Sequence, residues 1–181
     1  MLFDSNHTTA YVSLGSNLGD RAGNLLLAVR GLLEASFDVV KLSAIYETEP
    51  VGIDGDADDF LNMAVELRCT SITATQMMAR MLRIEYVLGR KDKNLKRPRT
   101  IDLDLVFFGN HRITSPFLTV PHPRMHLRNF VLVPMVEIAP RFVHPVLKKN
   151  MVELLDESTD TANVKRWDPL ILTGSELIRA S

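Results

Sequence analysis

The sequence has only one cysteine, Cys69, among its 181 residues, and no apolar run approaches the length of a membrane span. A single cysteine excludes an internal disulfide and any metal site built from several thiolates, and it fits a reducing compartment. The formal net charge is −1, so no overall field draws the chain to nucleic acid or to an anionic membrane. No signal peptide is visible, and we expect a cytoplasmic protein without nucleic-acid or membrane partners.

Several familiar catalytic signatures are also missing. The turn from Gly15 to Gly19 lacks the lysine of a phosphate-binding loop, and no protein-kinase catalytic loop or serine-hydrolase elbow is present. The chain has no internal repeat and no low-complexity tract. Hydrophobic residues make up 46% and charged residues 24%, as in ordinary globular proteins. We therefore expect one domain over residues 1–165, followed by a tail of unassigned role over residues 166–181.

The order of periodic segments predicts an α+β fold. Apolar alternation and helical spacing indicate a strand, a helix, two strands, a helix and a strand, which is the βαββαβ order of a ferredoxin-like core. The expected segments are strands at 9–14, 39–46, 60–67 and 101–108, with helices from Arg21 and from Ser71 or Thr73 to Gly89. Additional C-terminal strands and helices follow: a return strand near Ile113 and helices at 129–138 and 151–156.

Two aspartates dominate the strand at 101–108. Ile101, Leu103 and Leu105 alternate with Asp102 and Asp104, so the apolar side chains face the core and both carboxylates face the other way. The carboxylates then lie about 6.6 Å apart along the strand, at a rise of ~3.3 Å per residue. Two neighbouring anions favour a bound cation, and Mg²⁺ is the simplest one; the alternative is an exposed acidic strand face.

The charge along the chain is uneven. Residues 47–59 carry six acids and no base, and residues 90–99 carry six bases and one acid. Taken alone, each run is more often a solvated loop. The basic run directly precedes the paired aspartates, however, and cations beside metal-binding carboxylates suit a polyphosphate. The polar loops Glu47–Asp58 and Gly89–Arg99 flank the proposed site, so we expect them to move during turnover.

Two further groups of residues suit ligands. His122 lies between two prolines, and Arg124 and Arg128 are four residues apart, so both arginines could face one anion if the segment is helical. Phe60 and Asn62 share one face of a strand, where an aromatic ring and an amide suit a flat heterocycle. Structural roles remain the alternative for His122 and Phe60.

Taken in order, these motifs resemble the 6-hydroxymethyl-7,8-dihydropterin pyrophosphokinase family over about Tyr11 to Pro140. The matching motifs are Gly15-Ser16-Asn17-Leu18-Gly19-Asp20-Arg21, Tyr46-Glu47-Thr48-Glu49-Pro50-Val51-Gly52, Asp59-Phe60-Leu61-Asn62, Gly89-Arg90, Pro98-Arg99-Thr100-Ile101-Asp102-Leu103-Asp104-Leu105, and Thr119-Val120-Pro121-His122 with Arg128 and Phe130. The sequence departs from the family at Lys96 and Arg97, where many members have an aromatic residue and a glycine.

The resemblance implies transfer of pyrophosphate from ATP to the pterin hydroxymethyl group, in folate biosynthesis. It implies two Mg²⁺ ions held by Asp102 and Asp104, with ATP as co-substrate and with Arg90 and Arg99 as catalytic arginines. By the same resemblance, the nucleotide contacts are Arg90, Leu105, Thr119, His122 and Arg128, and the pterin contacts are Thr48, Val51, Phe60, Asn62 and Phe130.

Some alternatives stay open at this stage. The acceptor of the hydroxyl proton is Asp104, a metal-bound water or the phosphate. The rival functions are a nucleic-acid-binding module on a ferredoxin-like sheet, which the basic loop favours, and a metal-dependent phosphohydrolase. We expect the protein to act as a monomer on small-molecule substrates.

Overall fold

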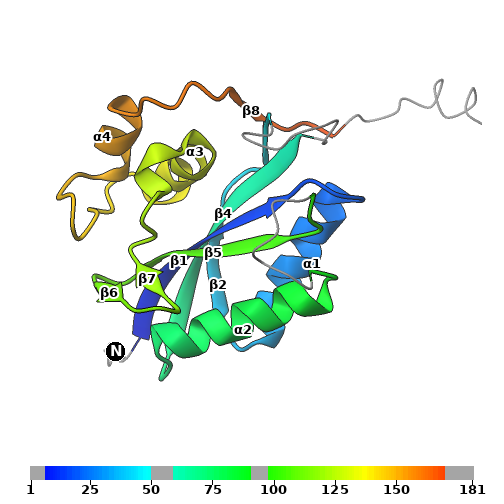
Figure 1. Cartoon of the computed structure of the whole chain (residues 1–181), viewed down its shortest axis with the longest axis horizontal. Coiled ribbons are helices and arrows are strands. Elements are labelled where there is room, and N and C mark those ends of the chain that lie inside the picture. The colour runs from blue at the N-terminus through cyan, green and yellow to red at the C-terminus, as the bar shows by residue number, and fades with distance from the viewer. Residues whose placement is uncertain (1–6, 50–58, 91–97, 170–181) are drawn as a thin grey trace, which may run out of the picture.

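A computed structural model describes residues 7–49, 59–90 and 98–169 of the chain (Figure 1). Its main sheet has six antiparallel strands in the order β5-β1-β4-β3-β8, with β2 also paired to β4. The strands are β1 (His7–Ser16), β2 (Asp38–Leu42), β3 (Tyr46–Thr48), β4 (Phe60–Thr70), β5 (Asp102–Phe108) and β8 (Val164–Arg166). The short strands β6 (Ile113–Thr114) and β7 (Thr119–Val120) form a separate hairpin. The strand expected near Ile113 is therefore confirmed, but it pairs with β7 instead of returning along β5.

Helices cover both faces of the sheet. Helices α1 (Arg21–Glu34) and α2 (Ala74–Val87) lie on one face, and α3 (Asn129–Ile138) with α4 (Met151–Asp156) lies on the other (Figure 1). Asp20 accepts a hydrogen bond from the Gly23 N–H at the start of α1, and Thr73 forms a capping box with Gln76 at the start of α2. The order β1-α1-β2-β4-α2-β5 confirms the ferredoxin-like α+β fold with additional C-terminal elements.

The prediction of a single strand at 39–46 is wrong, because the structure divides that segment into β2 and β3. Both strands pair with β4, and the break falls at Ser43. There the Ser43 hydroxyl accepts a hydrogen bond from the Ala64 N–H at 2.9 Å, so a side chain replaces a backbone acceptor. β8 was not expected; it pairs with β3 and spans the predicted boundary at residue 165, and residues 170–181 lie outside the described chain.

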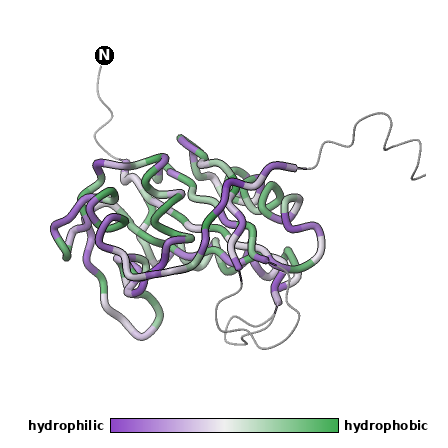
Figure 2. Tube along the Cα trace, turned by 90° about the horizontal axis from the view of Figure 1, so that it is seen from above, coloured by the Kyte–Doolittle hydropathy of each residue, from purple (hydrophilic) through white to green (hydrophobic). Residues whose placement is uncertain are grey.

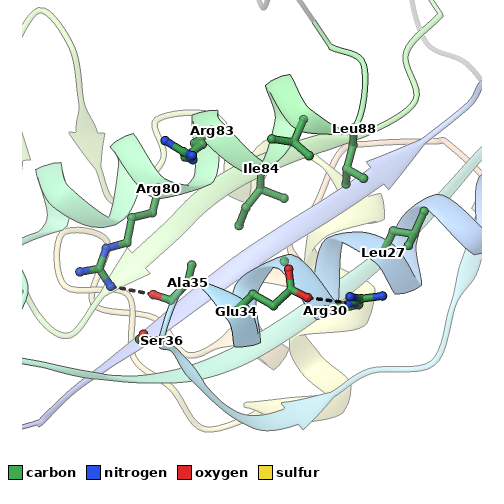
Figure 3. Close-up of a pocket in the computed structure, with 11 residues that line it drawn as sticks. Leu27, Arg30, Glu34, Ala35, Ser36, Arg80, Arg83, Ile84 and Leu88 are labelled. Atoms are coloured by element: carbon green, nitrogen blue, oxygen red, sulfur yellow. Dashed lines mark hydrogen bonds and ion pairs between the residues drawn. The ribbon is translucent and has the colours of Figure 1, made fainter.

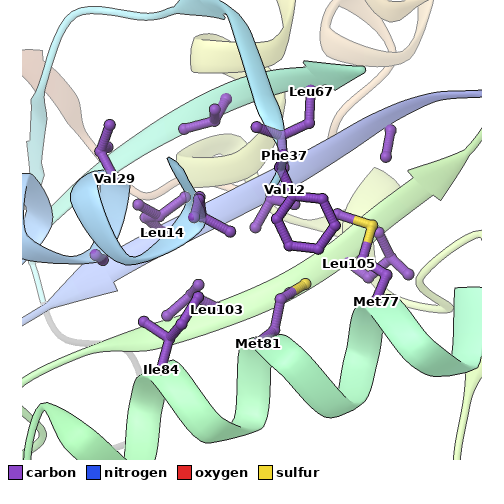
Figure 4. Close-up of a cluster of buried hydrophobic side chains, with 14 of the residues drawn as sticks. Val12, Leu14, Val29, Phe37, Leu67, Met77, Met81, Ile84, Leu103 and Leu105 are labelled. Carbon is purple, nitrogen blue, oxygen red and sulfur yellow. The ribbon is translucent and has the colours of Figure 1, made fainter. Parts of the chain in front are cut away.

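Two apolar clusters fill the space on either side of the sheet. Figure 4 shows the first, where Leu103 and Leu105 of β5 meet Met77, Met81 and Ile84 of α2. The second lies under α3 and α4 and includes Phe107, Leu132, Met135 and Met151. Along the trace, apolar segments alternate with hydrophilic ones (Figure 2). In the part of the chain described, no helix is both long enough and apolar enough to cross a bilayer.

Candidate active site

The paired aspartates begin strand β5, on the sheet face opposite α1 and α2. Ile101, Leu103 and Leu105 are at most 3% exposed and belong to the cluster under those helices, whereas Asp102 and Asp104 are half-buried. The alternation expected from the sequence is therefore confirmed. Because side chains on a strand alternate, both carboxylates share one face of the sheet.

A row of residues crosses three strands at this point. Gly15 of β1 is the register partner of both Asp102 on β5 and Asn62 on β4. Adjacent strands lie about 4.8 Å apart, so about 10 Å separates the backbones of Asp102 and Asn62. A Cβ atom at Gly15 would lie 3.1 Å from the Asn62 Oδ1 atom and 3.7 Å from the Phe60 ring. The glycine thus keeps the surface between the carboxylate and the amide free of a side chain.

Two of the predicted pterin contacts meet on the Asn62 side of this row. Asn62 is 3% exposed, and its Nδ2 atom donates to the Thr48 hydroxyl at 2.7 Å. This bond orients the buried amide, which an apolar setting requires. Phe60 lies two residues before Asn62 on β4 and is half-buried. Val51 lies outside the described residues.

Arginines lie over both aromatic rings that were predicted to contact the pterin. The Arg99 guanidinium carbon is 5.5 Å from the centroid of the Phe60 ring, and that of Arg128 is 5.4 Å from the centroid of the Phe130 ring. Phe130 belongs to the first turn of α3. Burial lowers the pKa of Arg128, as does the nearby Arg124, while Asp104 and Asp102 oppose that shift. The electrostatic field of Arg128 therefore reaches the paired aspartates.

Asp102 is held by two arginines. The Arg99 Nη1 atom lies 2.9 Å from Asp102 Oδ2, and Arg90 Nη1 contacts Asp102 Oδ1. The Asp102 side chain still keeps 20% of its surface exposed. Two carboxylates on one strand fit Mg²⁺, which uses one or two carboxylates together with substrate phosphates. Among the described residues, no group of three or more His, Cys, Asp or Glu side chains could hold a metal ion on its own.

Two buried donors lie beside this ion pair. The Arg99 N–H donates to Asn17 Oδ1 at 2.8 Å, and the Asn17 N–H donates to the Arg99 carbonyl at 3.2 Å. Arg99 Nε and Asn17 Nδ2 are both buried and have no hydrogen-bond partner within the described ranges. Buried donors of this kind are costly unless an acceptor reaches them, and a phosphate oxygen is such an acceptor.

Arg90, predicted to contact the triphosphate, is only 9% exposed. Its guanidinium binds the carboxylate of Glu85 on α2 as well as Asp102. The sequence analysis missed Glu85. A signal was available, because Glu85 follows Met81 by four residues, and Met81 belongs to the buried face of the helix.

The remaining predicted nucleotide contacts are spread more widely. Leu105 lies in the core under α1 and α2, on the opposite face from the carboxylates, because the strand alternation that turns Asp104 outward turns Leu105 inward. Thr119 belongs to β7, and the His122 N–H donates to the Val106 carbonyl of β5 at 3.0 Å. The helix that would align Arg124 with Arg128 is limited to a single 3₁₀ turn at Met125–Leu127.

A separate hollow of about 520 Å³ lies between α1 and α2 (Figure 3). Leu27, Ile84 and Leu88 line its apolar part, and two polar contacts lie at its rim: Arg30 Nε to Glu34 Oε1 at 2.7 Å and Arg80 Nη1 to the Ala35 carbonyl at 2.7 Å. None of the residues predicted for the site lines this hollow. This hollow is therefore separate from the candidate site around Asp102 and Asp104.

Comparison with known proteins gives one family. The sequence model of the family 7,8-dihydro-6-hydroxymethylpterin-pyrophosphokinase (HPPK) matches residues 11–140 of this chain. The chain is 42% identical over 159 residues to a 2-amino-4-hydroxy-6-hydroxymethyldihydropteridine pyrophosphokinase of Bacillus subtilis (strain 168), covering 87% of this chain and 89% of that protein. It is 33% identical over 151 residues to the protein of the same name in Aquifex aeolicus (strain VF5), covering 83% of this chain and 92% of that protein.

Solved structures agree at the level of fold. The structure described as Plasmodium falciparum HPPK-DHPS wild type with SDX-DHP superposes with a TM-score of 0.68 at 15% sequence identity. The superposition covers 84% of this chain and 45% of that longer chain, so the present chain spans less than half of it.

Proposed function

We infer the activity from family membership, because the chain belongs to the 7,8-dihydro-6-hydroxymethylpterin-pyrophosphokinase family. The protein transfers the pyrophosphoryl group of ATP to the hydroxymethyl group of 6-hydroxymethyl-7,8-dihydropterin and releases AMP, a step of folate synthesis. The hydroxymethyl oxygen loses its proton and forms a bond to the β-phosphorus, and the bond from that phosphorus to the α,β-bridging oxygen breaks. AMP leaves with the bridging oxygen, and the hydroxyl proton is released. Chemistry of this kind depends mainly on positioning and charge stabilisation.

We propose that the two substrates meet over the row formed by Asp102, Gly15 and Asn62. The single observation that carries this proposal is the shared register of Gly15 with the other two residues, which brings a carboxylate and a buried amide to one face of the sheet. Phosphates then lie near Asp102, and the pterin lies near Asn62. The bare surface of Gly15 allows the reacting oxygen and phosphorus to approach between them.

We propose that the pterin ring stacks on Phe60 and Phe130 and that Asn62 reads its aminopyrimidinone edge. Thr48 keeps the amide in one orientation, because it accepts the Nδ2 hydrogen bond. Val51 completes the proposed set. The nucleotide is assigned to Thr119, His122 and Arg128, and Leu105 would support it only indirectly, from the core below β5.

For the metal, we propose that Asp102 and Asp104 hold two Mg²⁺ ions. The support is chemical: two half-buried carboxylates on one face, next to buried donors that suit phosphate oxygens. When bound, the ions neutralise the triphosphate and make its β-phosphorus easier to attack. Arg99 and Arg128 supply the remaining positive charge from the chain itself, and Arg90 acts with them.

The test is a coupled assay of AMP release with ATP, Mg²⁺ and the hydroxymethyl pterin. We expect AMP only when the pterin is present, and Asp102→Ala should abolish turnover while the circular-dichroism spectrum stays unchanged. Release of phosphate from ATP without the pterin would favour the phosphohydrolase. Near-normal turnover of Asp102→Ala in Mg²⁺ would contradict the assignment of the metal site.

We also propose that the protein works in the cytoplasm as a monomer, with neither nucleic acid nor membrane as a partner. The single, buried cysteine supports the cytoplasmic location, and the net charge of −1 supports the absence of a nucleic-acid or membrane partner. Sedimentation at working concentration tests the monomer, and a salt titration with an oligonucleotide tests the absence of nucleic-acid binding.

A further inference from the structure

Glu85 is a buried carboxylate in the last turn of α2. It is 2% exposed, and its Oε1 atom accepts hydrogen bonds from Arg90 Nη1 at 3.0 Å and from the Leu103 N–H at 2.7 Å. Burying a carboxylate is unfavourable unless opposite charge and hydrogen bonds compensate. These two bonds contribute that compensation, and one of them fixes the backbone between Asp102 and Asp104.

The end of α2 brings Arg90 back toward Glu85. Gly89 has a φ angle of +94°, and the Arg90 N–H donates to the Glu85 carbonyl at 2.9 Å. A left-handed glycine followed by this bond is the Schellman ending of a helix, which reverses the chain. The Arg90 side chain therefore returns along its own helix and lies between Glu85 and strand β5.

From that position Arg90 contacts both acidic residues. Its Nη1 atom donates to Glu85 Oε1, to the Ile101 carbonyl at 3.3 Å and to Asp102 Oδ1. One guanidinium charge is thus divided between two carboxylates. If Glu85 were neutral, the same positive charge would act on Asp102 alone and would bind it more tightly.

We propose that Glu85 is a positioning residue, which keeps Arg90 from fully occupying Asp102 and so leaves that carboxylate available to a divalent cation. The inference rests on the proposed metal site and goes beyond it, because it assigns Glu85 a role exerted through Arg90. Glu85 orients and balances the groups behind the site and does not itself contact the substrate.

The test uses Glu85→Gln, which keeps the size of the side chain and an acceptor for the Leu103 N–H but removes the charge. Binding of Mn²⁺ alone, followed by electron paramagnetic resonance, should weaken by roughly 10–100-fold, the usual effect of losing a partner behind a metal ligand. Turnover should then require correspondingly more Mg²⁺, with kcat recovering at saturation. Unchanged Mn²⁺ affinity would overturn the proposal.

A double variant tests whether Glu85 acts through Arg90. In Glu85→Gln/Arg90→Gln, the competing guanidinium is gone, so Mn²⁺ affinity should rise again toward the wild-type value. If the double variant binds Mn²⁺ no better than Glu85→Gln, then Glu85 does not act through Arg90 and the proposal fails. Thermal melts of both variants establish that each is folded at the temperature of measurement.

Glu66→Gln is the matched control. Glu66 is also a carboxylate in an ion pair, with Lys41 at 3.0 Å, and its side chain is 13% exposed. Glu66 is the register partner of Tyr11 on β1, four residues away from Gly15. Removing the charge of Glu66 should therefore leave Mn²⁺ affinity unchanged. Mn²⁺ binding needs no turnover, so a wild-type protein that binds Mn²⁺ but releases no AMP would contradict the activity and leave the role of Glu85 intact.

Discussion

Arg99 contacts three other residues of the site. Its guanidinium binds Asp102 and lies over the Phe60 ring, and its backbone forms two hydrogen bonds with Asn17. The Nε atom remains without a partner among the described residues. A fixed guanidinium with a donor to spare can stabilise charge that develops on a transferred phosphoryl group.

We predict that Arg99→Ala lowers kcat by about 10²–10³, the loss usual for one preorganised charge stabiliser. Arg99→Lys should recover only part of the rate, because a single ammonium cannot contact Asp102 and a phosphate in the planar arrangement of a guanidinium. Steady-state assays check both. Arg112→Ala, at an exposed position, is the control, and full activity of Arg99→Lys would show that charge alone suffices.

At the scale of elements, the ending of α2 decides where Arg90 and Thr100 lie. Gly89 turns the chain, and the Thr100 hydroxyl then donates to the Leu88 carbonyl at 2.7 Å. Helix α2 and the start of β5 are therefore joined directly beside the paired aspartates. A change in the turn at Gly89 should therefore shift Arg90 at the site.

We predict that Gly89→Ala destabilises the fold by about 1–2 kcal/mol, because an L-residue is strained at this φ angle. The methyl group itself has room, since the nearest atom is 3.8 Å away. The variant should also lose activity at temperatures where it is fully folded, because Arg90 moves with the turn. Gly109→Ala also places an L-residue at a positive φ angle, +51°, with its Cβ 3.2 Å from Thr8 Cγ2. Gly109 lies at the far end of β5, so this variant should lose stability without losing kcat.

The segment joining α3 to α4 depends on a neutral histidine. His144 is 4% exposed, and its Nδ1 atom accepts hydrogen bonds from the N–H groups of Val146 and Leu147, both at 3.1 Å. Burial, with a smaller contribution from His126, lowers the pKa of His144 to about 4. A protonated Nδ1 could not accept these bonds.

We predict that this histidine makes stability depend on pH below neutrality. The folded-state pKa is depressed from 6.5, so the unfolded chain binds the proton first as the pH falls. The contribution is therefore complete above pH 6.5 and is lost progressively between pH 6.5 and about 4, up to about 3 kcal/mol. Denaturant melts across this range should show a flatter profile for His144→Asn, whereas the exposed His111→Asn should follow the wild type.

At the scale of the whole molecule, the site exists because three strands align. Asp102, Gly15 and Asn62 are 40 to 87 residues apart in sequence, and only strand register makes them neighbours. The two sides of the row face different substrates in the proposed function. A side chain placed at Gly15 should thus disturb the pterin side, near Asn62 and Phe60, more than the phosphate side, near Asp102.

We predict that Gly15→Ala raises the KM for the pterin by at least about 10-fold, since its Cβ would lie 3.1 Å from Asn62 Oδ1 and the amide must shift. The affinity for Mn²⁺ should change little, because neither of the two nearest atoms belongs to an aspartate. Substrate titrations and Mn²⁺ binding measure the two effects. Equal losses on both sides would mean that the two substrates are not arranged as proposed.

The sequence alone predicted much of this arrangement. The period of two in β5 predicted that Asp102 and Asp104 share a face, and capping residues such as Thr73 and the left-handed Gly89 marked the limits of α2. These signals are local, because strand alternation, helix caps and turns depend on residues within a few positions of each other. The family resemblance carried the residue roles further, and those roles remain predictions.

Only the tertiary structure decided the rest. Strand register aligned Gly15 with Asp102 and Asn62, Ser43 divided one expected strand into two, and β8 joined the edge of the sheet. Packing placed the charge of Glu85 behind Arg90, where a helix pattern alone marks only a buried position. Such pairings depend on contacts between distant segments, whose free energy comes from burial and charge in the folded state, so no local pattern contains them.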